Sequence, residues 1–374
     1  MLQTAYDFMY KPGDYIYRGS LLLNNATLPQ KKKLSNIMLY ATDKCNARCK
    51  HCYIWAKSPK QCMDMKIVEK IVSDKAVSQK TRIGLEGGEF LLHYRHENIL
   101  ELLTEKHPSF DLLSNCVLPD NLTNLVKKYL VPLQNKAHPP RLYISLDGTQ
   151  TTHDRLRGVS GLYNSVLEVI RTLGNTLPIS VMFTLMPFNT FEDLEHVAKI
   201  CENFGLDLRI GIYNNMQYFE TKVSSSAPNS SLDYPTAAIP DFVRNFEENF
   251  DFLALYHYYR QGELSLPCRS IRDSVVVYPN GDIPLCQNKE IILGNLHEKN
   301  LSQIINNKET LKLHKQYKRC NDCWINFHRK YDIVLYRNLE KIFGKKLVEL
   351  ALGNYQWCGN KKLSYKDTIQ QITH

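Results

Sequence analysis

The feature that most constrains the fold is a regular alternation of strand-like and helix-like segments between residues 36 and 213. The strand-like segments are short apolar runs, and the segments between them place apolar residues at helical spacing. The predicted strands are 36–42, 82–86, 110–114, 141–146, 179–186 and 207–213, and the predicted helices are 65–77, 98–105, 121–130, 162–173 and 191–204. Strands that alternate with helices pair in parallel, so the pattern predicts an α/β fold built as a parallel barrel.

Three closely spaced cysteines, Cys45, Cys49 and Cys52, follow the first predicted strand. An iron–sulfur cube takes four thiolates, so a loop that offers three leaves one iron free to bind another molecule. Structural zinc loops also use short cysteine spacings, and here His51 or a distant residue would be the fourth ligand. The three cysteines alone leave both kinds of metal site open.

Two further strands end in residues that suit ligand binding. The strand 82–86 runs into Gly-Gly-Glu at 87–89, where glycines let the backbone approach a ligand and the carboxylate can pair with an ammonium group. The strand 141–146 ends in Ser-Leu-Asp-Gly at 145–148, and the polar run 153–158 follows it. Both motifs favour the iron–sulfur interpretation over zinc.

These motifs occur in the order and at the approximate spacing of the radical S-adenosylmethionine (radical SAM) superfamily, which the chain resembles. In that family a Cys-x3-Cys-x2-Cys loop follows the first strand of a TIM-like partial (β/α)6 barrel. The resemblance implies that Cys45, Cys49 and Cys52 hold a [4Fe-4S] cluster whose fourth iron binds S-adenosylmethionine (SAM). Reduction then cleaves SAM to a 5′-deoxyadenosyl radical, which abstracts hydrogen from an unactivated C–H bond.

The resemblance also implies which residues bind SAM. The expected contacts are Gly87, Gly88 and Glu89 to its amine, Ser145 to its ribose, and Arg157, with Arg155 as the second candidate, to its carboxylate. The alternative for Ser145 is a turn at the end of a strand. The alternative for Arg157 is a solvated position at the start of a helix.

A second group of cysteines lies near the C-terminus: Cys268, Cys286, Cys320 and Cys323. Four thiolates from two separated segments make a closed site, which suits structural zinc or a fully ligated cluster. Within this region, residues 274–286 are predicted to form a β-hairpin with an Asn-Gly turn.

The context of this group resembles the SPASM and twitch extensions of radical SAM enzymes, in which a Gly-x4-Cys segment follows an upstream cysteine. That resemblance implies an auxiliary [4Fe-4S] cluster in addition to the one that binds SAM. A full SPASM domain would continue with a Cys-x5-Cys-x3-Cys pattern, whereas residues 324–329 contain no cysteine. We therefore expect one auxiliary cluster, held by a small α+β domain of the twitch type.

The expected order of domains follows from these assignments. It is an N-terminal extension 1–35, a radical SAM partial barrel 36–218, a linker and helix 219–265, an auxiliary cluster domain 266–327 and a C-terminal helical tail 328–374. The linker is polar over 224–232, and an aromatic-rich helix is predicted at 241–259. The first 35 residues are too short for a separate peptide-recognition domain, and the tail is predicted to begin as an amphipathic helix that packs on the barrel.

The composition agrees with a soluble enzyme of the cytoplasm. The chain has 374 residues, 43% of them hydrophobic, and its 11 cysteines without a signal peptide indicate a reducing compartment in which thiols bind metals. No apolar run is long enough to span a membrane. The net charge of +9 comes from scattered residues without a nucleic-acid-binding motif. It suits an acidic substrate or an acidic electron donor of the flavodoxin or ferredoxin type.

Two other cysteines are candidates for a catalytic role. Cys116 follows the predicted strand 110–114, and Cys358 lies in an aromatic segment of the tail. A thiol near the substrate could donate a hydrogen atom to a carbon radical, the step that would make the enzyme an epimerase. The alternative for each is an ordinary packed thiol.

Three functions remain open at this point. The leading one is an oxidoreductase that abstracts hydrogen from a ribosomally made peptide and then oxidises or cross-links it. The second is a dehydrogenase or epimerase that acts on a carbohydrate or aminocyclitol in natural-product biosynthesis. The third is an iron–sulfur or zinc scaffold that binds a partner without catalysis.

Overall fold

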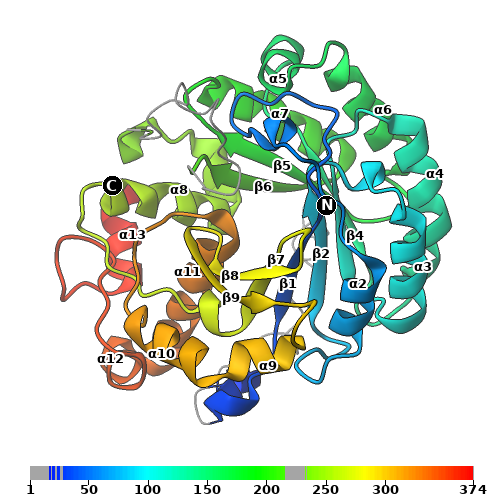
Figure 1. Cartoon of the computed structure of the whole chain (residues 1–374). Coiled ribbons are helices and arrows are strands. Elements are labelled where there is room, and N and C mark those ends of the chain that lie inside the picture. Colours follow the sequence, from blue (N-terminus) through cyan, green and yellow to red (C-terminus); the bar gives the residue numbers. More distant parts are fainter. Residues whose placement is uncertain are drawn as a thin grey trace.

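A parallel sheet of seven strands forms the centre of the computed structural model, which describes residues 17, 19–21, 23–25, 28–214, 232 and 234–373 (Figure 1). In chain order the strands are β1 (Asn36–Thr42), β2 (Arg82–Gly87), β3 (Phe110–Ser114), β4 (Arg141–Ser145), β5 (Ile179–Leu185), β6 (Asp207–Ile212) and β7 (Ser274–Val277). Their order in the sheet is β6-β5-β4-β3-β2-β1-β7, and every neighbouring pair is parallel. The sheet curves into a half barrel, which confirms the predicted α/β class.

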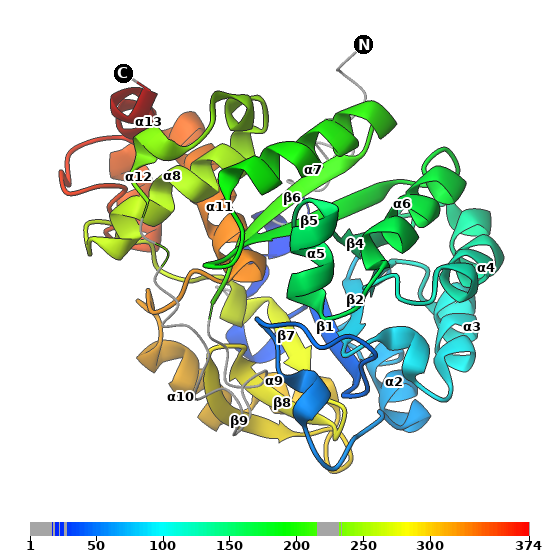
Figure 2. The same ribbon diagram turned by 90° about the horizontal axis from the view of Figure 1, so that it is seen from above.

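Helices cover the outer face of this sheet (Figure 2). They are α2 (Met65–Val72), α3 (His96–Lys106), α4 (Pro119–Tyr129), α5 (Gln150–Arg157), α6 (Leu162–Leu173) and α7 (Phe191–Phe204). Beneath them, outward-facing strand residues such as Leu85, Leu112 and Ile144 are completely buried. The largest difference from the predicted boundaries of these helices is at α2, which ends at Val72 rather than at residue 77. The Asp74 side chain accepts a hydrogen bond of 2.7 Å from the following backbone and closes a turn there.

The seventh strand corrects the prediction of a hairpin at 274–286. β7 lies beside β1 in the barrel sheet, with Asn36 paired to Ser274. The hairpin instead joins β8 (Asp282–Cys286) to β9 (Lys289–Asn295), which are antiparallel. The Asn-Gly turn is present between β7 and β8. β7 is buried at every position, the pattern typical of a parallel strand covered on both faces, and this burial places it in the barrel.

Helix α11 (Asn326–Phe343) occupies the side of the half barrel that the sheet leaves open (Figure 2). One face of this helix lines the barrel interior, and α8 (Glu247–Arg260) packs against both α11 and β6. The amphipathic helix expected at the start of the C-terminal tail is thus a wall of the barrel. The remaining helices are α9 (Leu301–Asn306), α10 (Lys308–Gln316), α12 (Lys345–Leu352) and α13 (Tyr365–Thr373).

Two expectations for the connecting region have different outcomes. The helix predicted at 241–259 is divided into a 3₁₀ turn, Asp241–Asn245, and α8. The polar linker 224–232 lies outside the described residues except at its last position. In the described part of the chain, no helix has the length and apolar character needed to cross a lipid bilayer.

Strand β6 is the last strand on its side of the sheet, and Asn249 of α8 completes its hydrogen bonding. The backbone N–H of Ile210 donates to Asn249 Oδ1 over 3.1 Å, and Asn249 Nδ2 donates to the carbonyl of Leu208 over 2.8 Å. One side-chain amide thereby satisfies a buried donor and a buried acceptor on the edge of the sheet.

We expect the change Asn249→Ala to destabilise the protein by about 2–4 kcal/mol, because it leaves these two buried backbone groups without partners. Chemical denaturation followed by circular dichroism measures the effect. The matched control is Asn98→Ala on the exposed surface of α3, for which we expect a change within about 0.5 kcal/mol. Equal effects for the two variants would contradict this role of Asn249.

Candidate functional site

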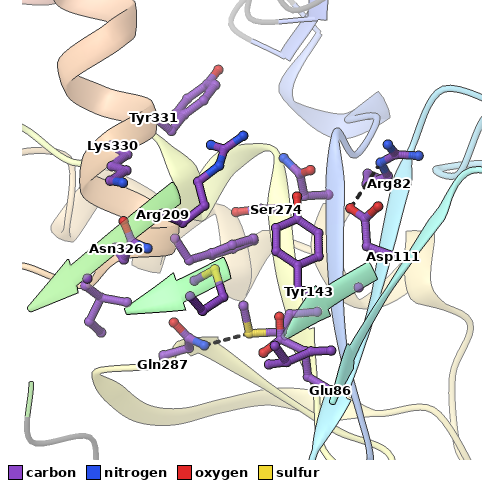
Figure 3. Close-up of a pocket in the computed structure, with 18 of the residues that line it drawn as sticks. Arg82, Glu86, Asp111, Tyr143, Arg209, Ser274, Gln287, Asn326, Lys330 and Tyr331 are labelled. Atoms are coloured by element: carbon purple, nitrogen blue, oxygen red, sulfur yellow. Dashed lines mark hydrogen bonds and ion pairs between the residues drawn. The ribbon is translucent and has the colours of Figure 1, made fainter. Parts of the chain in front are cut away.

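The interior of the half barrel encloses a cavity of about 700 Å³ (Figure 3). Successive side chains of a strand point to opposite faces, and here the inward positions are largely polar whereas the outward positions are aliphatic. The inward residues include Arg82, Glu86, Asp111, Tyr143 and Arg209. The volume falls within the range of small-molecule sites, and the charged and polar groups on the wall could orient a ligand there.

The three cysteines of the first group lie on the loop that follows β1, at the carboxyl end of the sheet. Their thiols are close enough to interact electrostatically, and Cys52 lines the cavity. Burial, with a smaller contribution from the neighbouring thiols, raises the pKa of Cys45 to about 11 and that of Cys52 to about 12. Metals bind thiolates, so a bound cluster would supply the positive charge that these buried groups need to ionise.

The Gly-Gly-Glu segment at the end of β2 is hydrogen-bonded to the start of this cysteine loop. The N–H of Gly88 donates to the carbonyl of Thr42, and the N–H of Glu89 donates to the carbonyl of Lys44, each over 2.7 Å. A Cβ atom on Gly88 would overlap the Lys44 carbonyl. Gly88 is therefore needed for the cysteine loop to pack against the end of β2, in addition to any contact with SAM.

The other side of the cysteine loop rests on the end of α5. The N–H groups of Arg48 and Lys50 donate to the carbonyls of Arg157 and Leu156, each over 2.9 Å. Gly158 ends α5 with a φ of 66°, and a Cβ atom there would lie 2.9 Å from the Arg48 carbonyl oxygen. The loop is thus held by backbone groups from two motifs that the sequence analysis singled out separately.

Arg157 joins β4 to the cysteine loop through its side chain. Its Nε and Nη2 atoms lie 2.7 and 2.6 Å from Oδ2 of Asp147, which is fully buried. Its Nη1 atom lies 3.9 Å from Cys49 Sγ, so the guanidinium places positive charge beside a candidate ligand. Because Asp147 occupies the Nε side of the guanidinium, a SAM carboxylate would have to approach the remaining N–H groups of Nη1 and Nη2.

Glu89 links β3 to the cysteine loop and is 2% exposed. Its oxygens accept hydrogen bonds from Ser114 Oγ over 3.0 Å and from the N–H of Asn115 over 2.8 Å. Asn115 in turn donates to Asn46 Oδ1 over 2.8 Å and lies 3.8 Å from Cys45 Sγ. Burial raises the pKa of Glu89 to about 7, a shift that an ammonium group nearby would reverse.

Only some of the residues predicted to bind SAM line the cavity. Ser145 and Arg157 line the cavity together with Cys52, whereas the Gly-Gly-Glu segment lies outside its lining. Arg155, the second candidate for the carboxylate, instead donates to the carbonyl of Phe188 over 3.0 Å at an exposed position. The structure therefore brings Ser145 and Arg157 together at the cysteine loop and separates Arg155 from them.

The second group of cysteines converges at the junction of the β8–β9 hairpin with the segment before α11. Cys286 interacts electrostatically with Cys323 and Cys320, and burial is the main reason that its pKa rises to about 11. The N–H of Cys268 donates to the carbonyl of Cys320 over 2.9 Å. Three of the thiols thus lie near one another, and the backbone of Cys268 lies beside that of Cys320; all four thiols are buried or half-buried.

Neither group of cysteines is arranged around a single ion. Among the residues that the structure describes, no three or more His, Cys, Asp or Glu side chains are placed to hold one metal ion. The ligands of an iron–sulfur cube bind separate irons and therefore stand further apart than the ligands of one zinc. Thiols, three in one group and four in the other, are the donors that iron–sulfur clusters use.

The two candidate hydrogen donors lie outside the cavity lining. Cys116 is completely buried in the hydrophobic core and has a φ of 62°, a left-handed conformation that favours glycine. Cys358 is 4% exposed, and its sulfur lies 3.7 Å from Thr368 Oγ1 in the C-terminal region. These positions agree with packed thiols, and a hydrogen-donor role stays a prediction.

The sequence analysis missed the polar inner surface of the sheet. Glu86, Tyr143 and Arg209 occupy alternate positions in strands that were recognised by their apolar residues alone. The signal was present as a period of two, with polar residues between aliphatic ones. Gln287 and Lys330 also line the cavity. They reach it only because the C-terminal region packs against the barrel, and no local sequence pattern indicates that packing.

Two family models match the chain. One, described as the radical SAM superfamily, matches residues 39–201, which include the cysteine loop and both of its backbone anchors. The other, SPASM, described as an iron–sulfur cluster-binding domain, matches residues 268–324, which include all four cysteines of the second group. Both matches confirm the resemblance drawn from the motifs.

Individual relatives agree with these assignments. The antilisterial bacteriocin subtilosin biosynthesis protein AlbA of Bacillus subtilis (strain 168) is 23% identical over 278 residues, which are 73% of this chain but only 59% of that protein. Streptococcus suis SuiB, solved bound to the precursor peptide SuiA, has a TM-score of 0.55 at 14% identity, covering 81% of this chain and 72% of that chain.

A further solved structure, native anSMEcpe with bound AdoMet and the Cp18Cys peptide, has a TM-score of 0.51 at 14% identity and covers 85% of this chain and 99% of that chain. At such identities the likeness concerns the fold. The matched domains imply SAM and iron–sulfur clusters as cofactors. Residues 39–201 thus match the radical SAM superfamily, and residues 268–324 match an iron–sulfur cluster-binding domain of the SPASM type.

Proposed function

We propose that this protein is an oxidoreductase that removes a hydrogen atom from an unactivated C–H bond of a ribosomally made peptide and then oxidises or cross-links the peptide. One observation carries the proposal: a single cavity is lined both by Cys52 of the first cysteine group and by Gln287, the neighbour of Cys286 in the second. When bound, SAM and the clusters supply the radical that takes the hydrogen and an acceptor for the electron left on the substrate.

At the first site, we assign Cys45, Cys49 and Cys52 as the thiolates that hold the SAM-binding cluster. Arg157 orients and stabilises this set, because its guanidinium is fixed by Asp147 and faces Cys49. The cavity wall beside Cys52 would receive SAM. The contacts of Ser145, Gly87, Gly88 and Glu89 with SAM stay predictions.

At the second site, we assign Cys268, Cys286, Cys320 and Cys323 as a closed set of ligands for one auxiliary cluster. Arg329 is buried beside it and donates to the carbonyl of Cys323 over 2.7 Å. Its charge offsets the negative charge that four thiolates bring into a region of low dielectric. With four thiolate ligands, no iron of the cluster would be free to bind substrate. Such a cluster suits electron transfer.

A peptide is the substrate that the relatives favour. The printed name of AlbA concerns bacteriocin biosynthesis, and SuiB and anSMEcpe were solved with peptides. A cavity of about 700 Å³ has the size of small-molecule sites, so SAM and one reacting side chain would enter while the rest of the peptide stays outside. A carbohydrate or aminocyclitol remains the second candidate, since it would fit the same space.

The substrate class is testable by mass spectrometry. Peptides translated from reading frames beside the gene would be incubated with the reconstituted enzyme, SAM and a reduced flavodoxin, the donor type that we expect. Oxidation or cross-linking removes two hydrogen atoms from the peptide. Release of 5′-deoxyadenosine with aminocyclitol oxidation, and without any change in these peptides, would overturn the peptide assignment.

Two matched glycine variants test whether the end of α5 is needed to hold the cysteine loop. Gly158 and Gly205 both end helices with left-handed backbones, with φ of 66° and 64°, but only Gly158 lies against the cysteine loop. Each change to alanine costs about 1–2 kcal/mol of backbone strain. We expect Gly158→Ala also to lower the iron content after anaerobic reconstitution and Gly205→Ala to keep it. Equal iron in both variants would show that the α5 anchor is unnecessary.

The fate of the substrate radical is tested by removing the electron acceptor or the thiol. We expect the double change Cys320→Ala with Cys323→Ala to stop product formation, because the electron then has no acceptor, while SAM cleavage without product continues. Cys116→Gly, which suits the left-handed backbone, should leave product formation near wild type. Loss of product in Cys116→Gly, or solvent deuterium at the reacting carbon in D2O, would instead support an epimerase.

A further inference from the structure

Glu86 is a carboxylate on the cavity wall without a counter-ion. It lies on the inner face of β2 opposite Tyr40 of β1. Within the described ranges it forms neither a hydrogen bond nor an ion pair, and burial raises its pKa to about 7, with Asp111 contributing. An ionised acid in this state is stabilised by a cation that enters the cavity close to it.

Three of the cationic side chains that line the cavity are paired with acids of their own. Arg82 lies 3.2 Å from Asp111, and Arg209 lies 2.6 Å from Asp207. Arg157 is held by Asp147, as described above. In the part of the chain that the structure describes, Asp111 is the only charged neighbour that shifts the pKa of Glu86, so the cations that line the cavity do not neutralise this carboxylate.

Gln287 supplies an independent sign of a missing donor at the same place. This side chain is 5% exposed, lines the cavity, and donates from Nε2 to Tyr40 Oη over 2.7 Å. Nε2 also lies 2.6 Å from Met38 Sδ, and this neighbour favours the amide N–H over the amide oxygen at this position, because the sulfur lone pairs would repel the oxygen. Its Oε1 atom has no hydrogen-bond partner among the described residues. A buried acceptor in this state is costly unless a ligand satisfies it.

Tyr40 connects these two acceptors with the cysteine loop. Its hydroxyl receives the hydrogen bond from Gln287, and it interacts electrostatically with both Glu86 and Cys52. A group bound by Glu86 and Gln287 would therefore lie between the first cysteine group and Cys286. That is where the proposed function needs the reacting carbon.

We propose that Glu86, with Gln287 beside it, binds a primary ammonium group of the substrate. The proposal rests on the function given above and narrows its substrate to a molecule that carries such a group near the carbon that loses hydrogen. An ammonium group offers three donors and a positive charge, which match one unpaired carboxylate and one unpaired amide oxygen. A lysine side chain, a peptide N-terminus and an amino sugar share this chemistry.

Equilibrium dialysis of the SAM-loaded holoenzyme tests the proposal with four probes. Nα-acetyl-lysine N-methylamide presents a side-chain ammonium, norleucine N-methylamide a terminal one and glucosamine a sugar one, while Nα-acetyl-norleucine N-methylamide is the neutral reference. We expect at least one ammonium probe to bind about 10- to 100-fold more tightly than the reference, the range of a charge-assisted hydrogen bond. The probe that binds identifies the source of the ammonium group.

Two variants and a control make the test specific. Glu86→Gln should abolish the preference for ammonium probes, and Gln287→Leu should reduce it, whereas Glu105→Gln on the exposed face of α3 should keep it. Iron content and circular dichroism verify that each variant is folded. No preference in the wild type, or a preference that survives in folded Glu86→Gln and Gln287→Leu, would overturn the proposal.

The outcome is separable from that of the proposed function. Release of 5′-deoxyadenosine by the wild-type enzyme without any probe tests SAM chemistry alone. If 5′-deoxyadenosine forms but no ammonium preference exists, the binding site is wrong and the SAM cleavage that the proposed function requires stands. If the preference exists and SAM is not cleaved, the binding site stands and the proposed reaction is wrong.

Discussion

Backbone hydrogen bonds from two distant motifs hold the loop of Cys45, Cys49 and Cys52, and the rest of the site depends on them. One anchor comes from the end of β2 and the other from the end of α5. Such bonds need no particular side chain, but they need the two backbones to come very close. Gly88 and Gly158 permit that approach because neither carries a Cβ atom. The Arg157–Asp147 pair then places a fixed positive charge beside the thiol of Cys49.

The C-terminal region completes the barrel and also carries the second group of cysteines. β7 extends the parallel sheet next to β1, and α11 closes the open side of the half barrel. Between these elements, Gln287 reaches Tyr40 of β1 from the position after Cys286. The cavity wall is therefore complete only when the two regions are packed together. This shared wall explains how a substrate bound at one site can lie close to the other.

The sequence was sufficient for the local elements, since the predicted strands and helices depend on hydrophobic periodicity and both cysteine groups on spacing. The partners of β7 were not predictable, because Ser274–Val277 suits either a hairpin or a buried parallel strand and only packing decides. The seating role of Gly88 also depends on a loop more than 40 residues away in sequence, at Lys44. Glu86 was overlooked because it lies within a strand recognised by its apolar neighbours, although the alternation of polar and apolar residues was visible.

Iron analysis with electron paramagnetic resonance, after anaerobic reconstitution, tests the central claim that two separate cysteine groups hold two clusters around one cavity. The account predicts about eight irons per chain in the wild type and about four in the variant with Cys45, Cys49 and Cys52 all changed to alanine, which should retain only the auxiliary signal and release no 5′-deoxyadenosine. Zinc in the remaining site, or about twelve irons in the wild type, would contradict it.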